Sequence, residues 1–344
     1  MKRTDFTFEL PEDQIALYPP ERRDASRLLV DDGTTLHDRS FSDIAEYFGP
    51  QDILVLNNSR VRPARTHFVR STGGLVELLW VRPLPDGKAW EVFGQTTRLK
   101  PGETLHDQYD ASKTITVLHR EGEYATVEPH FEAEPFLQQQ AALALPPYIT
   151  KRRGEQQWSA DAERYQTVFS APVGSIAAPT ASLHWTPELL DAVRAKGTEI
   201  LYITHHVGPG TFKPIRVDEL AEHRVDPEYC EISDAVATRL RAALDAGQRI
   251  TVGGTTACRA LEGVYLHNGL RASYRGPIDL TILPGFKFHV TQRLITNFHV
   301  PESSLLLLVA ALLGPRWRAV YDHAVQHGYR FYSYGDVGLV TTLN

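Results

Sequence analysis

The feature that most constrains the fold is an alternation of β-rich and helical patterns over residues 165–300. A helical pattern at 187–195 is followed by the β-rich run EILYITHHV at 199–207, and a second helical pattern after Ser233 is followed by RITVGG at 249–254. Strands that alternate with helices in this way are typical of a sheet covered by helices. We therefore expect a mixed α/β fold whose main domain contains a large mixed sheet.

Residues 66–147 follow a different pattern. LVELLWV, AWEVFGQ, TITVL and YATVE are short β-rich runs, and turn signals such as Gly73-Gly74 and Pro101-Gly102 separate them. Strands this closely spaced predict a small antiparallel β-barrel or sandwich. The αβ pattern resumes afterwards, so we expect an inserted small β-rich domain at 66–147 and a discontinuous main α/β domain made of 1–65 and 148–344.

Local patterns give further predictions. The apolar run Asp52–Leu56 is typical of a buried strand, and Leu280–Leu283 predicts another. Helices are predicted around Phe136–Leu143 and over Asp161–Phe169. Between them the segment LPPYI predicts an extended connector, because a residue before proline is disfavoured in helical conformation.

Composition limits the cellular setting. The two cysteines, Cys230 and Cys258, lie far apart and match no metal-ligand spacing, which is typical of a reducing compartment. The N-terminus carries acidic residues where a signal peptide needs an apolar run. The longest apolar run, Leu305–Leu313, is far shorter than the roughly 20 residues of a membrane span and predicts a buried core helix. We therefore expect a cytoplasmic protein with no membrane partner. We also expect a monomer, although composition does not determine the oligomeric state.

Charge is unevenly distributed along the chain. The formal net charge of −6 argues against a protein that coats nucleic acid nonspecifically. Basic residues nevertheless cluster in the segments Arg60–Arg70, Lys151–Arg153 and Arg22–Arg27. Solvated surface charge explains any one cluster, but local basic patches on an acidic protein also fit a single defined RNA. We predict that the Arg60–Arg70 segment helps to bind RNA.

A loop of small residues, GSIAAPTASLHWT at 174–186, leads directly into a predicted helix. Ala177, Ala178 and Ala181 have almost no side chain, so a flat ligand could lie against the backbone there. His184 could face such a ligand and move a proton near neutral pH. The alternative is a tight loop packed under the helix, with His184 simply hydrogen-bonded.

Three further loops place a histidine or a carboxylate beside glycine, threonine or asparagine, around His206, His299 and Asp336. Each has a purely structural explanation, but four such loops predict a shared cleft. His205 and His206 alternate along a strand and point to opposite faces, so they do not form a bidentate metal site.

The turn GTTACR at 254–259 predicts a strand-to-helix junction whose backbone amides could bind a carboxylate or phosphate. It lacks the spaced glycines and the lysine of a phosphate-binding P-loop, and it lacks the dinucleotide fingerprint. The residues alone thus indicate a ligand-binding enzyme that uses acid–base chemistry.

At the level of whole segments, the chain resembles the S-adenosylmethionine:tRNA ribosyltransferase-isomerases of queuosine biosynthesis from end to end. The resemblance is specific because many segments match in the same order. They are ERRDASRLLV, VLNNSRVRPAR, LPPYI, ERYQTVF, GSIAAPTASLHWTPELL, HHVGPGTFKPI, GTTACRALE, LITNFHVPESSLLLLVAALLG and YRFYSYGD.

The resemblance implies transfer and isomerisation of the ribosyl group of S-adenosylmethionine onto the aminomethyl-deazaguanine at the tRNA wobble position. The implied products are epoxyqueuosine-tRNA, adenine and methionine. S-adenosylmethionine is then a co-substrate and ribosyl donor, with no bound cofactor and no metal. The implied partners are S-adenosylmethionine and the tRNAs of the queuosine pathway.

Proton transfer is central to this chemistry, because the sulfonium acidifies the neighbouring ribose carbon and adenine leaves more easily when protonated. Histidines near their reference pKa can act as acid or base. We therefore expect His184, His206 and His299 to transfer protons, with Asp336 orienting a group or accepting a proton.

Substrate contacts are expected from several loops. Thr255, Thr256 and Arg259 could hold the methionine carboxylate, since arginine offers bidentate geometry. Asn57, Asn58 and Arg60 could contact the acceptor base or the anticodon backbone, whose bases can be splayed out. The other expected substrate contacts are Ser175, Pro179, Thr180, Gly208, Gly210, Thr211, Phe212, Asn297 and Tyr334.

The sequence departs from the family pattern after His223, where Arg224–Glu228 replaces a Met-His-Ser-Glu-like stretch, so a second histidine is missing. Ala257-Cys258 also replaces a common Ser-Val pair, with Cys258 expected in the core. Two other functions stay open: an S-adenosylmethionine-dependent RNA methyltransferase and a non-catalytic tRNA-binding protein. The methyltransferase is disfavoured, because this sequence has no glycine-rich loop with a downstream acidic residue near its N-terminus.

Overall fold

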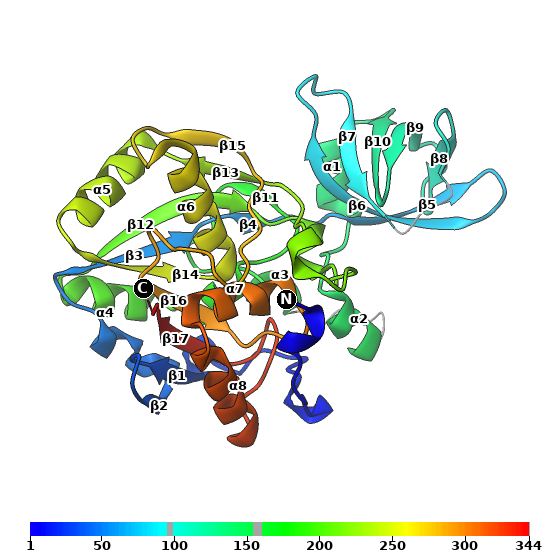
Figure 1. Ribbon diagram of the computed structural model, residues 1–344. Coiled ribbons are helices and arrows are strands. Elements are labelled where there is room, and N and C mark those ends of the chain that lie inside the picture. The colour runs from blue at the N-terminus through cyan, green and yellow to red at the C-terminus, as the bar shows by residue number, and fades with distance from the viewer. Residues whose placement is uncertain (95–98, 154–159, 344) are drawn as a thin grey trace.

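A nine-stranded mixed sheet runs through the main part of the protein, and a separate barrel projects from it (Figure 1). The computed structural model describes residues 1–94, 99–153 and 160–343. Across the sheet the strands lie in the order β15 (Tyr274–Ile278), β13 (Glu228–Ile232), β12 (Glu199–His206), β3 (Asp52–Asn57), β14 (Arg249–Gly253), β16 (Arg293–Asn297), β17 (Val337–Thr341), β1 (Arg27–Asp31) and β2 (Leu36–Ser40).

The centre of this sheet is parallel. Strand β3 pairs in parallel with β12 and β14, and β14 pairs in parallel with β16, whereas β13, β15 and β2 pair antiparallel. All six residues of β3 are buried, as expected for a strand covered on both faces. The carboxyl ends of β12, β3, β14 and β16 therefore open at one edge, where sheets of this type bind ligands.

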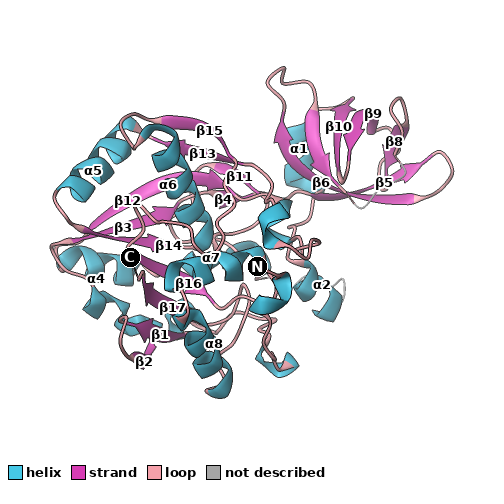
Figure 2. Cartoon of the chain, in the orientation of Figure 1, coloured by secondary structure: helices cyan, strands magenta, loops and turns pink. Residues whose placement is uncertain are grey.

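Helices cover both faces of the sheet, as Figure 2 shows. The larger core packs one face against α5 (Asp234–Asp245), α6 (Thr255–Asn268), α7 (Ser304–Leu313) and α8 (Arg316–Gln326). The other face packs against α4 (Pro187–Ala195) and η4 (Phe41–Tyr47). Side chains of Thr186, Ser233 and Ser303 cap α4, α5 and α7 by accepting a backbone N–H.

The inserted segment forms a closed six-stranded antiparallel barrel, so the predicted fold class is confirmed. Its strands are β5 (Arg65–Arg70), β6 (Leu75–Pro83), β7 (Trp90–Phe93), β8 (Thr104–Asp107), β9 (Thr114–Glu121) and β10 (Tyr124–Pro129). Helix α1 (Ala133–Gln140) packs Phe136 and Leu137 into the barrel core beside Trp80. The domain limits at 66–147 stay a prediction.

Short elements complete the described part of the chain. A two-stranded parallel sheet joins β4 (Arg60–Val61) to β11 (Val173–Ser175). The remaining short helices are η1 (Arg3–Phe6), η2 (Glu12–Gln14), η3 (Arg23–Ala25), α2 (Pro147–Arg153), α3 (Asp161–Arg164), η5 (Thr180–Ser182), η6 (Pro209–Phe212) and η7 (Leu220–Glu222).

Three local predictions need correction. Leu280–Leu283 is not a strand: the strand ends at Ile278, and the apolar side chains of 280–283 pack irregularly against the core. The connector LPPYI is only partly extended, because Pro147 begins α2, a position that proline suits. The helix predicted at Asp161–Phe169 ends after Arg164.

Among the described residues, no single helix is long and apolar enough to cross a membrane. Only α7 and α8 taken together meet that length and composition, and they are bent by 118°. Most of the α7 side chains are buried in the larger core, so this apolar run is a core helix as predicted.

Candidate active site

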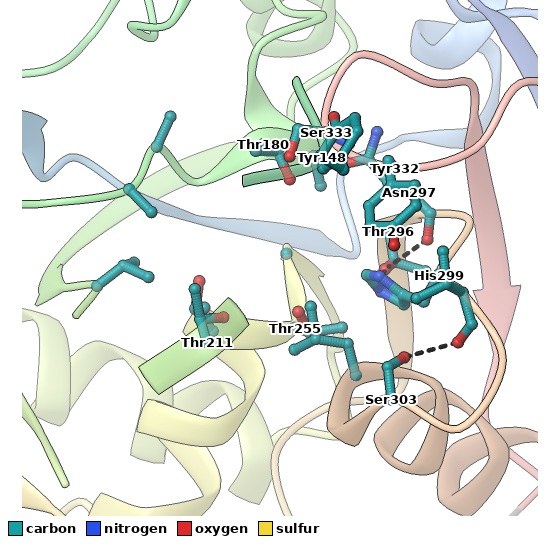
Figure 3. A pocket seen from close by; sticks show the side chains of 18 of the residues that line it. Tyr148, Thr180, Thr211, Thr255, Thr296, Asn297, His299, Ser303, Tyr332 and Ser333 are labelled. Atoms are coloured by element: carbon teal, nitrogen blue, oxygen red, sulfur yellow. Dashed lines mark hydrogen bonds between the residues drawn. The ribbon is translucent and has the colours of Figure 1, made fainter. Parts of the chain in front are cut away.

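A cavity of about 480 Å³ lies beyond the carboxyl ends of the central parallel strands (Figure 3). Val207 follows β12, Gly254 follows β14 and Asn297 ends β16, and all three line the cavity. The volume is in the usual range for a site that takes a drug-sized ligand.

Seven of the residues predicted to contact substrate or move protons line this cavity. They are Pro179, Thr180, Thr211, Thr255, Thr256, Asn297 and His299. Ala177, Ala178 and Ala181 also line it, as expected for a loop of small residues that lets a flat ligand approach the backbone. The predicted shared cleft thus receives residues from the loops around 177–181, 211, 254–256 and 296–305.

His299 is the predicted catalytic histidine that lines the cavity. Its Nε2 lies 2.9 Å from Thr296 Oγ1, whose hydroxyl donates to the backbone oxygen of Asn297 at 3.2 Å. The Thr296 oxygen therefore accepts from Nε2–H, which leaves Nδ1 with its lone pair. Burial lowers the pKa of His299 to about 3, so the ring is neutral at pH 7. The neutral ring of His299 thus has its unprotonated nitrogen at Nδ1.

His184 lies behind the cavity wall rather than in it. It is 1% exposed, and its Nε2 lies 3.3 Å from Nδ2 of Asn297. Burial, with a smaller effect of the nearby Arg330 charge, lowers its pKa to about 3. The structural alternative fits this placement, because His184 packs on Phe41 and supports Asn297 without touching the cavity.

His206 is also outside the cavity wall. Its Nδ1 lies 2.8 Å from Ser59 Oγ, which lies 2.6 Å from Ser175 Oγ. Gly174 covers the ring so closely that an added Cβ would lie 2.6 Å from it. Burial lowers the pKa of His206 to about 4. His205 points to the opposite face of β12, as predicted, and is fully buried.

Asp336 is used to hold its own loop. Its carboxylate accepts the backbone N–H groups of Arg27 at 2.9 Å and Arg330 at 2.8 Å, and the residue is 2% exposed. Both oxygens are therefore occupied by structural donors, and the side chain does not line the cavity.

Several predicted substrate contacts are likewise occupied by internal partners. Asn57 is fully buried: its Nδ2 donates to the backbone oxygen of His205, and its Oδ1 accepts from the backbone of Ser59 and His205. Four other predicted contacts also lie outside the cavity wall and form hydrogen bonds within the protein. Asn58 accepts from Thr204, and Ser175 accepts from the Val207 backbone. Gly208 donates to Glu228, and Tyr334 donates to Asp161. The side chain of Phe212 lies outside the described residues.

Arg259 lies in a small chamber of about 40 Å³ that also contains Gly210 and shares Thr211, Thr255 and Thr256 with the main cavity. Its guanidinium forms an ion pair with the buried Glu228. The Arg259 charge holds the pKa of Glu228 at about 2, against the opposing effect of burial. Arg259 is thus neutralised by a carboxylate that the sequence prediction did not include.

In the Arg60–Arg70 segment, which we predict to help bind RNA, most of the arginines have partners within the protein. Arg62 is 6% exposed and donates to the backbone oxygens of two barrel residues, while Arg65 and Arg70 lie against the carboxylates of Glu77 and Glu103. Arg60 is exposed. Three of the four guanidinium groups therefore serve the junction with the barrel and the barrel itself.

The sequence prediction missed an aromatic part of the cavity wall. Tyr148 and Tyr332 stack with ring centroids 4.0 Å apart and both line the cavity (Figure 3). Beside them the wall is basic, with Lys151 and Arg152 of the basic cluster seen in the sequence, and with Lys213. The segments LPPYI and YRFYSYGD contain these tyrosines, but tyrosines in loops are common and gave no specific signal. In the described part of the chain, no group of three His, Cys, Asp or Glu side chains could hold a metal ion.

Comparison with known proteins gives a consistent result. The chain matches the model of a family described as queuosine biosynthesis protein over residues 3–340. It is 42% identical to the S-adenosylmethionine:tRNA ribosyltransferase-isomerase of Cereibacter sphaeroides, covering 99% of each chain. It is 44% identical to the protein of the same name from Azoarcus sp., covering 98% of this chain and 96% of the other.

A solved structure is similar as well. The crystal structure of S-adenosylmethionine tRNA ribosyltransferase from Thermotoga maritima has a TM-score of 0.55 and 30% identity to this chain. The match covers 98% of this chain and 99% of that one, so both domains take part in it.

Proposed function

Since the chain belongs to the queuosine biosynthesis protein family, we propose that it transfers and isomerises the ribosyl group of S-adenosylmethionine onto a tRNA base, in the cavity at the carboxyl edge of the main sheet. S-adenosylmethionine is the co-substrate. The observation that carries the choice of site is His299, a neutral histidine that lines a cavity of about 480 Å³. The acceptor is the aminomethyl-deazaguanine at the wobble position, and the product is epoxyqueuosine-tRNA with release of adenine and methionine.

His299 is the proton acceptor of this proposal. Its low pKa disfavours the charged imidazolium at neutral pH, so the ring is not available to protonate adenine, and we assign it the remaining role of proton acceptor. The sulfonium of the donor acidifies the neighbouring ribose carbon, where a positioned base is needed. His184 acts as a positioning residue for Asn297 and Asp336 as one for the 330–336 loop, and His206 holds Ser59, which in turn contacts Ser175.

The methionine carboxylate binds at the start of α6. Gly254, Thr255 and Thr256 line the cavity, and α6 has no side-chain cap at its N-terminus. Its first backbone N–H groups are therefore available to an anion, and the helix dipole favours negative charge there. Arg259 forms an ion pair with Glu228, so it helps to position the first turns of α6 and adds no net charge to the carboxylate site.

The tRNA approaches over α2. Lys151 and Arg152 both line the cavity and are exposed, which suits contacts to phosphates beside an extruded base. We therefore propose that Lys151 and Arg152 contribute more to tRNA binding than Arg62, Arg65 and Arg70 do. A monomeric, cytoplasmic protein remains part of the proposal, as do the inserted-domain limits at 66–147.

The test is an assay with S-adenosylmethionine and tRNA carrying the aminomethyl-deazaguanine. We expect equal amounts of adenine and methionine, with the epoxycyclopentane nucleoside detected by mass spectrometry. His299→Asn is expected to lower kcat by about 100-fold or more, whereas His119→Asn, on an exposed part of the barrel, leaves it unchanged. S-adenosylhomocysteine as the product would instead indicate the methyltransferase, and tRNA binding without turnover would indicate the binding protein. The family comparisons support neither alternative.

A further inference from the structure

The loop at 330–336 holds one bulky residue in a strained conformation at the cavity wall. Tyr332 has a backbone φ of 72°, in the left-handed region that residues other than glycine and asparagine rarely adopt. Strain of this kind persists only where the surrounding structure fixes it, and such residues concentrate at ligand-binding positions.

Four separate groups fix this loop. The carboxylate of Asp336 accepts the backbone N–H of Arg330 at 2.8 Å, and the amide of Asn297 lies 3.4 Å from the backbone oxygens of both Gly335 and Asp336. The Tyr332 backbone N–H donates to the Phe298 oxygen at 3.0 Å. The Asp336 carboxylate also accepts the backbone N–H of Arg27 at 2.9 Å, so the loop is held from β1, from the end of β16 and by its own residues.

The fourth group comes from α2. The backbone N–H of Ser333 donates to the hydroxyl of Tyr148 at 3.1 Å. The two tyrosine rings then stack with an interplanar angle of 21° and centroids 4.0 Å apart. Both rings line the cavity and both residues are only partly buried (Figure 3). The strain at Tyr332 thus accompanies a stacked aromatic pair in the cavity wall.

An unpaired polar atom lies in the same wall. Asn297 is 2% exposed and lines the cavity, and in the described structure its Oδ1 has no hydrogen-bond partner. The two backbone oxygens beside Nδ2 fix the orientation of the amide, because only an N–H can face them. A buried acceptor without a partner is costly, so a bound N–H group would be stabilised there.

From the aromatic pair, the strained backbone and the Asn297 acceptor, we infer that Tyr332 is a binding residue for a fused-ring nucleobase. The base stacks on the Tyr148–Tyr332 pair, and an amino group of the base donates to Asn297 Oδ1. This rests on the proposed function, in which two substrates carry such a base with an amino group: the adenine of S-adenosylmethionine and the deazaguanine of the tRNA.

Substitutions at Tyr332 separate stacking from folding. Tyr332→Gly removes the ring and relieves the positive φ, so the variant is expected to keep its melting temperature within a few degrees while affinity falls about 10- to 100-fold. Tyr332→Phe keeps the ring and is expected to bind within about twofold of the wild type. Tyr332→Asn, which tolerates this backbone conformation, replaces the glycine variant should that variant unfold. Tyr109→Ala, at a 77% exposed ring on the barrel, is the matched control.

Two dissociation constants are measured: one for S-adenosylmethionine by calorimetry, and one for an anticodon stem-loop with the modified base by filter binding. Weaker binding of S-adenosylmethionine alone assigns the surface to adenine, and weaker binding of the stem-loop alone assigns it to deazaguanine. Unchanged constants for a folded Tyr332→Gly variant overturn the inference while leaving the proposed function intact. A wild-type protein that binds neither substrate overturns both.

Discussion

Asp336 gives the sharpest test of how this site is built, because sequence reasoning made it catalytic and the structure makes it a loop anchor. Its carboxylate accepts two backbone N–H groups, from Arg27 at 2.9 Å and Arg330 at 2.8 Å, in a place where the residue is 2% exposed. Both carboxylate oxygens thus have structural donors, and the side chain does not line the cavity, which supports a positioning role.

The cost of removing this anchor follows from the two donors that it satisfies. Each buried N–H left without a partner costs about 1–3 kcal/mol, so Asp336→Ala, which leaves two such groups, is expected to lose about 2–6 kcal/mol of unfolding free energy. At about 2–4 °C per kcal/mol, the melting temperature falls by roughly 4–24 °C. Asp336→Asn keeps one acceptor oxygen and is expected to lose about half as much.

Thermal melts and steady-state kinetics on both variants check this reasoning, with the exposed Asp279→Asn as control. We expect higher KM values, because Tyr332 and Ser333, which line the cavity, belong to the loop that the substitution loosens. The kcat of Asp336→Asn is expected to stay within about tenfold of the wild type. Loss of a general acid or base would lower kcat by about 100- to 10,000-fold instead. A melting temperature equal to that of the wild type, with kcat reduced at least about 100-fold, would refute the anchor role.

Three further predictions follow from other contacts. Gly335→Ala is expected to disrupt the loop and abolish substrate binding, because its Cβ would lie 2.6 Å from a backbone carbonyl carbon, whereas Gly49→Ala is tolerated; calorimetry with S-adenosylmethionine tests this. Glu262→Ala is expected to destabilise the protein by about 3 kcal/mol or more, measured by urea unfolding, since this fully buried carboxylate accepts three consecutive backbone N–H groups. Burial lowers the pKa of His184 and His299 to about 3, while an unfolded histidine titrates near 6.5. Their contribution to stability is therefore complete above about pH 6.5 and is lost as the pH falls toward their folded pKa, by about 1.4 kcal/mol per pH unit for each histidine; urea midpoints from pH 7.5 to 5 measure the slope, and His299→Asn is expected to reduce it.

The fold could be predicted because its signals are local and repeated. Alternating strand and helix patterns gave the mixed sheet, and closely spaced turn signals gave the barrel. The errors fall where tertiary contacts override local preference. Leu280–Leu283 is apolar enough for a strand but packs as irregular chain, and the prolines of LPPYI begin a helix instead of preventing one.

The candidate site could be predicted only as a set of loops. Their shared position at one edge of the sheet follows from the parallel strands, so the prediction of a cleft held. Which side chain faces the cavity depends on hydrogen bonds between distant segments, such as the one that joins His184 to Asn297 across 113 positions. A sequence pattern cannot distinguish a histidine that touches substrate from one that holds the residue that does.

The departure from the family pattern after His223 shows the same dependence on distant contacts. In this segment, Asp226 accepts a hydrogen bond from Tyr124 of the barrel at 2.6 Å and pairs with Lys213 at 2.8 Å. Lys213 lines the cavity and also pairs with Glu123, next to Tyr124, at 3.3 Å. One cation therefore joins the barrel to the cavity wall. Where the family resemblance leads us to expect a histidine, the structure has a carboxylate that contacts Tyr124 of the barrel and Lys213 of the cavity wall.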